Sequence, residues 1–189
     1  MTGVPTADHN EAPQRRRPAV FFDRDGTLIV DPGYVYRVED LVFVPGAVAA
    51  IKRLNDLGYY VFIATNQSGI ARGYFTETDV QALHAELQRR LRGAGAHVDD
   101  IRYCPDHPDG TVERYRRNSD WRKPQPGMLL DLMRCWPVDR DASLAVGDRD
   151  TDVAAGEAAG LRSLLFPGGN LDEFLALHIE ARRGAKRIR

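Results

Sequence analysis

Cysteine is scarce in this chain, and the scarcity excludes one class of protein at the outset. The 189 residues include only Cys104 and Cys135, too few for the disulfide framework that holds small secreted domains together. No apolar run is long enough to cross a membrane, and the first residues lack the apolar core of a signal peptide. We therefore expect a cytoplasmic protein that makes no use of a membrane.

Neither sign of charge is in excess. Lys and Arg together number 26 against 27 Asp and Glu, which gives a formal net charge of −1. This balance gives no general electrostatic reason to expect a nucleic-acid partner. Basic residues gather only near the two ends, where we interpret them as solvated tails; they are Arg15, Arg16, Arg17, Arg182, Arg183, Lys186, Arg187 and Arg189.

Length and composition are those of one ordinary domain. A hydrophobic content of 43% and a charged content of 28% are typical of soluble globular proteins, and 189 residues suffice to bury a core. We predict a disordered leader over residues 1–18, a single domain over 19–178 and a basic tail over 179–189. A monomer is expected, with a small homo-oligomer as the alternative.

Predicted strands and helices alternate along the chain. The strands are predicted at 19–22, 59–64, 101–103, 143–147 and 161–166. Helices are predicted after Pro45-Gly46, after Thr76 (a capping box with Asp79), at Pro126, from about Thr151 and, as a short helix, after Asn170. Alternation of this kind, with near-continuous apolar strands, predicts an α/β fold with a doubly wound parallel sheet.

Polar side chains follow three of these strands. Asp23 and Asp25 follow the first, Thr65 and Asn66 end the second, and Asp148 follows the fourth. Ligands of an open parallel sheet bind at the carboxyl ends of its strands. Two neighbouring carboxylates repel one another unless they share a proton or a divalent cation. A solvated Asp-x-Asp turn remains the alternative at this point.

The stretch from Asp23 to Leu28, DRDGTL, resembles the first motif of the haloacid dehalogenase (HAD) superfamily. The other three motifs of that superfamily follow in order, as Thr65, Lys123 and the G-D-x-x-x-D run from Gly147 to Asp152. The resemblance implies a HAD-like Rossmannoid fold without a separate cap domain. It also implies a phosphatase that forms an aspartyl-phosphate intermediate.

In the superfamily the roles of these motifs are known, and they carry over to matching positions. The resemblance implies Asp23 as nucleophile and Asp25 as general acid and base, with a pKa that a neighbouring carboxylate helps to raise. It implies that Lys123, with Thr65 and Asn66, holds the transferring oxygens. Mg²⁺ would bind to Asp23, to Asp148 and to the backbone carbonyl of Asp25, while Asp152 supports the loop.

Longer stretches resemble one branch of the superfamily, the phosphatases of D-glycero-D-manno-heptose 1,7-bisphosphate, which act on the C7 phosphate. They are 31–35, the TNQSGIARG run at 65–73, 103–105 and 122–129. The resemblance implies that substrate is contacted by Asp31, Gly33, Tyr34, Thr65, Asn66, Gln67, Ser68, Arg122 and Arg149. Three alternatives stay open: a histidinol-phosphate phosphatase, a nucleic-acid 3′-phosphatase, and a phosphate-binding relative without turnover.

The sequence departs from that branch in one loop. The branch carries four zinc ligands there, as C-x-H and a later C-x-C. Here Cys104 is followed by Asp106 at the histidine position, with His107 one residue late, and Ser119 and Trp121 stand at the two later cysteine positions. We therefore predict no structural zinc and interpret Cys104 and His107 as remnants. Trp121 is predicted to fill the space of the metal, beside an unreactive Cys104 thiol.

Overall fold

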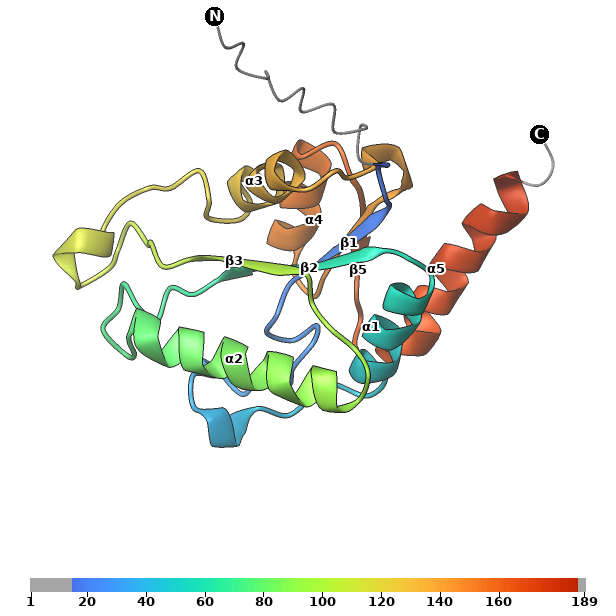
Figure 1. Cartoon of the computed structure of the whole chain (residues 1–189). Coiled ribbons are helices and arrows are strands. Elements are labelled where there is room, and N and C mark those ends of the chain that lie inside the picture. The colour runs from blue at the N-terminus through green and yellow to red at the C-terminus, as the bar shows by residue number, and fades with distance from the viewer. Residues whose placement is uncertain (1–14, 187–189) are drawn as a thin grey trace, which may run out of the picture.

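A five-stranded parallel sheet forms the centre of the computed structural model, which describes residues 15–186 (Figure 1). The strand order is β3-β2-β1-β4-β5. The strands are β1 Ala19–Phe22, β2 Tyr60–Asn66, β3 Asp100–Cys104, β4 Leu144–Gly147 and β5 Arg162–Leu165. The chain winds outward from β1 in one direction and then returns to wind the other way from β4. The strand order therefore reverses between β1 and β4, where open sheets of this kind bind ligands.

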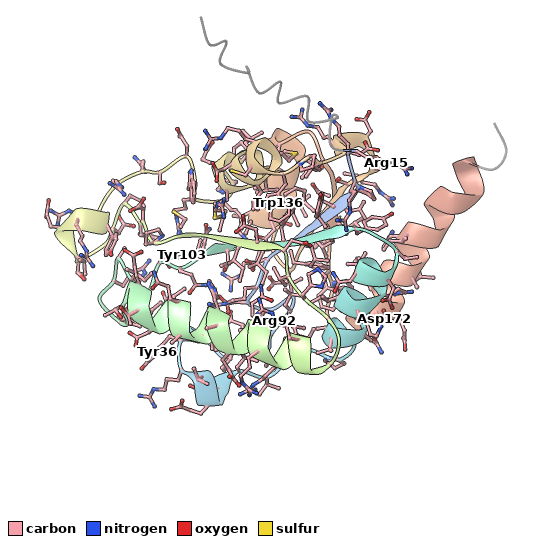
Figure 2. The ribbon with its side chains drawn as sticks, viewed as in Figure 1. Arg15, Tyr36, Arg92, Tyr103, Trp136 and Asp172 are labelled. Carbon is pink, nitrogen blue, oxygen red and sulfur yellow. The ribbon has the colours of Figure 1, made fainter. Side chains whose placement is uncertain are left out.

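Helices cover both faces of the sheet, as Figure 1 shows. On one face lie α1 Ala47–Asp56, α2 Glu77–Gly93 and α5 Leu171–Lys186, and on the other lie α3 Gly127–Cys135 and α4 Asp150–Ala158. Alternate residues of β1 point to opposite faces, so that Val20 and Phe22 pack under the first group while Phe21 packs under the second. Trp136 lies on the second face, against Tyr60 and Phe62 (Figure 2).

Local signals in the sequence account for most element boundaries. The Thr76 hydroxyl accepts from the Asp79 amide, and the Asp79 carboxylate accepts from the Thr76 amide, so the predicted capping box is present at the start of α2. Asn170 Oδ1 accepts from the amides of Asp172 and Glu173 and caps α5.

The strand order and the helices on both faces of the sheet confirm the predicted doubly wound parallel fold.

The ends of the domain differ from the expected boundaries. Arg17, placed in the predicted leader, pairs through its backbone with Pro137 and Asp139, and its guanidinium lies 4.0 Å from the centre of the Tyr60 ring. At the other end, the boundary predicted at residue 178 falls inside α5, and Ile179 is buried. Residues 1–14 of the predicted leader and 187–189 of the predicted tail lie outside the described residues.

Two long connections shape the edge of the sheet where β1 and β4 end. Between β1 and α1, residues 28–30 bond antiparallel to 42–44, and the loop between them, 31–41, contains a 3₁₀ turn at Val38–Asp40. Between β3 and α3 runs an irregular segment, 105–126, with one 3₁₀ turn at Glu113–Tyr115. Between residues 15 and 186 no cap domain is inserted. No helix in that range is long and apolar enough to cross a membrane.

Candidate active site

Three carboxylates meet at the ends of β1 and β4. Asp23, Asp148 and Asp152 each place one carboxylate oxygen within 4.8 Å of the other two. Asp23 and Asp152 are buried, and burial together with the charge of Asp23 raises the pKa of Asp148. Carboxylate oxygens in this concentration are the ligands that Mg²⁺ prefers, so the residues present fit a divalent cation.

Asp148 approaches this cluster across a glycine. Gly26 has a φ of +80°, and a Cβ added there would lie 2.3 Å from Asp148 Oδ2. Both the backbone conformation and the close contact exclude a side chain at this position. The glycine of the DRDGT motif thus lets the end of β4 come beside the turn that follows β1.

Lys123 is the cation at the centre of the site. Its ammonium group lies 2.7 Å from Asp23 Oδ1, 2.7 Å from Asp152 Oδ1 and 2.8 Å from the carbonyl oxygen of Ala64. Burial alone would lower the pKa of Lys123, but the two carboxylates outweigh it and raise the pKa. Lys123 is therefore a fixed positive charge between the predicted nucleophile and α4.

Asp25 lies beside Asp23 and is held from two directions. Its carboxylate accepts from the guanidinium of Arg24 and, at 2.8 Å, from the side-chain amide of Gln67. Burial raises the pKa of Asp25, and Arg24 opposes that rise. The sequence predicted a raised pKa from the neighbouring carboxylate; Asp23 does contribute, but burial has the larger effect.

A cavity of about 450 Å³ opens over these groups. It is lined by Asp23, Asp25, Asp31, Gly33, Tyr34, Asn66, Gln67, Ser68, Arg122, Lys123, Arg149, Asp150, Thr151 and Asp152. The structure thus gathers almost all the predicted site residues around one space. The exceptions are Thr65, which is buried beneath it, and Asp148, which lies at its edge beside Asp23.

Thr65 and Asn66 both bind other residues of the site. The Asn66 side chain exchanges two hydrogen bonds with the Lys123 backbone, at 3.0 and 3.1 Å, and the Thr65 hydroxyl oxygen accepts from Gln67. The Thr65 hydroxyl hydrogen is not used in that bond, and donation by these residues to the transferring oxygens stays a prediction. β2 extends through Asn66, and this extension turns the Asn66 amide toward the segment that carries Lys123. In this arrangement both residues hold other site residues in place.

Two arginines line the cavity beside the carboxylates. Arg149 lies at the start of α4 and pairs with Asp31, with 3.1 Å between Nη2 and Oδ2, and its Nε lies 3.8 Å from Asp148 Oδ2. Arg122 donates weakly to the carbonyl of Asp106 at 3.4 Å, and burial lowers its pKa. Tyr34, which also lines the cavity, has a left-handed backbone with φ 56° and packs edge-on against Tyr74. The cavity thus presents two guanidinium groups and an aromatic ring in addition to its carboxylates.

The 104–121 segment follows the prediction for Cys104 and contradicts it for Trp121. Cys104 is fully buried, and burial raises the pKa of its thiol. Trp121 was expected to fill the space of a metal, but it is 36% exposed. Its ring lies over Gly127 at the start of α3, because the backbone turns there before the helix begins. A cavity of about 470 Å³ remains, with Asp106, Ser119 and Trp121 in its lining.

Other contacts hold that segment. Asp106 is buried and pairs with Arg117 at 3.0 Å, and the hydroxyls of Tyr103 and Tyr115 both donate to Glu77 at the start of α2. The ligand set at the four zinc positions, with one thiol among them, does not fit a closed zinc site. The absence of zinc itself stays a prediction.

Sequence reasoning missed several residues around the site. Asp150 and Thr151 line the cavity at the first turn of α4, a position that the predicted strand-to-helix junction could have indicated. Arg24 stands at the variable position of the D-x-D motif and contacts Asp25 and Gln67. His84, on α2, is buried against Arg24.

Known proteins match this chain over most of its length. A HAD-hydrolase-like family model matches residues 120–185. D-glycero-beta-D-manno-heptose-1,7-bisphosphate 7-phosphatase of Rhodopseudomonas palustris is 49% identical over 171 residues, which cover 90% of this chain and 95% of the relative. The protein of the same name from Photorhabdus laumondii is 46% identical over 142 residues, or 75% of this chain and 76% of the relative.

A solved structure shares both fold and sequence. It is D,D-heptose 1.7-bisphosphate phosphatase from B. bronchiseptica, complexed with magnesium and phosphate, with a TM-score of 0.73 and 36% identity over 85% of this chain and 86% of that one. The chain belongs to the HAD-like hydrolases and, within them, to the family of the heptose-1,7-bisphosphate 7-phosphatases. The family and the enzyme class predicted from the sequence, a phosphatase, are confirmed.

Proposed function

We propose that this chain hydrolyses the C7 phosphate of D-glycero-D-manno-heptose 1,7-bisphosphate. The observation that carries the proposal is a single cavity lined both by Asp23 and by the guanidinium groups of Arg122 and Arg149. Two fixed cations in the same cavity as the nucleophile suit a small ligand with anionic charge beyond the phosphate that reacts. The names of the relatives support the same choice of substrate.

The first chemical step is assigned to Asp23. One of its oxygens is held by Lys123, which leaves the other oxygen to attack phosphorus and form an aspartyl-phosphate. A phosphate ester repels a carboxylate, and Lys123 offsets part of that repulsion. Asp23 and Asp148 would hold a magnesium ion, together with the backbone carbonyl of Asp25, and a bound ion would supply positive charge that offsets the remaining repulsion. Asp152 holds Lys123 from the other side.

The proton transfers are assigned to Asp25. It protonates the departing sugar alkoxide and then accepts a proton from the water that hydrolyses the aspartyl-phosphate. Burial favours its protonated form, as a general acid near neutral pH requires. Asp25 lines the cavity beside Asp23, so one phosphate can lie against both side chains.

A side-by-side assay tests the proposal. Phosphate release is measured with the heptose bisphosphate, its monophosphate, histidinol phosphate and a 3′-phosphorylated oligonucleotide, all at saturating Mg²⁺. We expect the bisphosphate to have the highest kcat/KM, because its second phosphate can bind Arg122 and Arg149, whereas the monophosphate and histidinol phosphate carry no second anion. Histidinol phosphate carries an amine at its far end and should be poor. A higher kcat/KM for histidinol phosphate contradicts the substrate, and release from none of the four contradicts turnover.

The protein is further proposed to act as a monomer in the cytoplasm. Light scattering during size-exclusion chromatography measures the oligomeric state, and a dimer at micromolar concentration would contradict the monomer.

A further inference from the structure

Arg24 is a charged side chain with no exposed surface. An unpaired buried charge costs several kcal/mol, so such a residue persists only where its donors are bound. Arg24 occupies the position between the two aspartates of the D-x-D motif and points away from the cavity, whose lining it does not join. The contacts of its guanidinium therefore show which residues it holds in place.

The guanidinium binds both oxygens of Asp25. Nε donates to Oδ1 and Nη2 donates to Oδ2, each at 2.9 Å. This fork-to-fork geometry fixes the plane of the carboxylate as well as its position. The side-chain amide of Gln67 donates to the same Oδ2 at 2.8 Å, and the Gln67 carbonyl accepts from Arg24 at 3.1 Å. Arg24, Asp25 and Gln67 form a closed ring of hydrogen bonds beneath the cavity.

The other side of Arg24 contacts two further elements. Nη2 donates to the carbonyl of Val35 at 2.9 Å, next to Tyr34 in the loop that borders the cavity. Nη1 lies 3.1 Å from Nε2 of His84, on α2. Arginine has no acceptor, so Nε2 must accept and the His84 ring must carry its proton on Nδ1. Burial and the charge of Arg24 lower the pKa of His84 to about 3, in agreement with a neutral ring.

We propose that Arg24 is a positioning residue that fixes the Asp25 carboxylate for proton transfer, and that neutral His84 holds Arg24 in that orientation. The inference rests on the proposed function, in which Asp25 is the general acid. It assigns roles to one residue inside the first motif and to another on α2, sixty positions further along the chain.

The alternative is that Arg24 merely supports the fold. The two roles differ in their dependence on the leaving group. A sugar alkoxide must be protonated as it departs, whereas p-nitrophenolate departs without a proton. A misplaced Asp25 therefore slows the first step, formation of the aspartyl-phosphate, much more for the sugar phosphate than for p-nitrophenyl phosphate. The second step is the same for both substrates, so the comparison uses kcat/KM, which reports the first step alone. A general loss of folded protein lowers both rates equally.

The test compares Arg24→Lys with Asp25→Asn and with the control Arg90→Lys. Arg90 also joins α2 to the loop before α1, by donating to the carbonyls of Leu41 and Val38, but it does not contact Asp25. General acid–base catalysis is typically worth about 10²–10⁴-fold, and we expect Arg24→Lys to lose about 10- to 100-fold in kcat/KM on the sugar phosphate. Its kcat/KM on p-nitrophenyl phosphate should fall less than about threefold, and Arg90→Lys should resemble wild type.

His84 supplies a second pair of variants if Arg24→Lys does not fold. His84→Gln keeps an acceptor for Arg24, and His84→Leu removes it. We expect the leucine variant to show the same selective loss on the sugar phosphate and the glutamine variant to recover most of it. Equal losses of kcat/KM on both substrates, or an Arg24→Lys enzyme with normal kcat/KM on the sugar phosphate while Asp25→Asn is impaired, would overturn the inference alone. Normal sugar-phosphate turnover by Asp25→Asn would overturn the proposed function as well.

Discussion

The site at the ends of β1 and β4 and the 104–121 segment both contain buried charge, but they hold it in different ways. At the sheet, the Lys123 ammonium meets two carboxylates and a carbonyl, all contributed by strand ends or by α4. In the segment, buried Asp106 has one oxygen without a partner, and its other oxygen pairs with Arg117, which is largely exposed. Hydrogen-bonded strands impose the first geometry, whereas the second depends on the loop's own side chains. The groups that bind the Lys123 ammonium are therefore positioned by the sheet and α4, and not by the side chains of the loop.

The largest expected effect comes from removing the nucleophile. Asp23→Asn should abolish turnover, because an amide oxygen cannot form the aspartyl-phosphate and is a weaker ligand for Mg²⁺. The measurement is phosphate release at saturating Mg²⁺. Near-normal activity in this variant would show that the reaction does not take place at the sheet site. The comparison of a catalytic sheet site with a non-catalytic loop would then be wrong.

Removing the Lys123 ammonium tests how much this ion pair contributes to the stability of the sheet site. Lys123→Met leaves Asp23 and Asp152 buried without their partner, and breaking such a pair typically costs about 3 kcal/mol or more in the free energy of unfolding. The matched loop variant is Tyr115→Phe, which keeps the ring and loses one hydrogen bond to Glu77, worth about 1 kcal/mol. Urea unfolding without Mg²⁺ measures both. Equal losses would mean that the loop is held as strongly as the site.

Each region contains a histidine, and replacing it should change the pH dependence of stability, an effect smaller than that of Lys123→Met. The pKa of His84 is lowered to about 3, mainly by burial. Above pH 6.5 the ring is neutral in both the folded and the unfolded state, so it has no effect on stability. Below that value the unfolded chain binds a proton that the folded chain excludes, and stability falls by up to about 1.4 kcal/mol per pH unit. His84→Gln should lose this dependence between pH 6.5 and 5, so its stability curve should be flatter than that of wild type.

The matched variant in the loop is His107→Gln. His107 is only partly buried, and burial and two neighbouring arginines lower its pKa. Its removal should change the pH dependence of unfolding less than the removal of His84. A larger change from His107 would mean that the loop, rather than the core beneath the site, governs stability in acid.

Metal removal is expected to have the smallest effect. With Mg²⁺ present, a zinc-selective chelator should leave the melting temperature unchanged, because Cys104 lacks the partners of a closed zinc site. Elemental analysis of protein purified without metal-chelate resin provides the second measurement. One zinc per chain, lost along with stability in Cys104→Ser, would show that the loop does hold a metal and that the contrast with the sheet is wrong.

Most of the fold and of the site could be predicted because both follow from local patterns. Apolar strand runs end at polar groups, and parallel strands bring those ends together, so the sequence alone sufficed to place Asp23, Asp25 and Asp148 at one edge of the sheet. Lys123 could be placed only by its order among the motifs. The length of α5 was underestimated because basic residues suggested a tail, although Leu171, Leu175 and Ile179 continue an apolar stripe.

The missed features depend on side chains from distant parts of the chain. The role of Arg24 depends on His84 and Gln67, far from it in sequence, and no local pattern reports such a partner. The exposure of Trp121 depends on the direction of the backbone just before α3, which residue type does not fix. The Asn66 side chain, similarly, faces Lys123 only because β2 runs two residues beyond its predicted end.

The contact between Gly26 and Asp148 has a consequence for how this protein tolerates mutation. A methyl group at position 26 would overlap the Asp148 carboxylate, at 2.3 Å, in a backbone conformation that other residues rarely adopt. Gly26→Ala leaves every charged residue of the site in the sequence, yet it drives one acid away from the other two. In a genetic screen this uncharged position would therefore be as intolerant as the aspartates themselves.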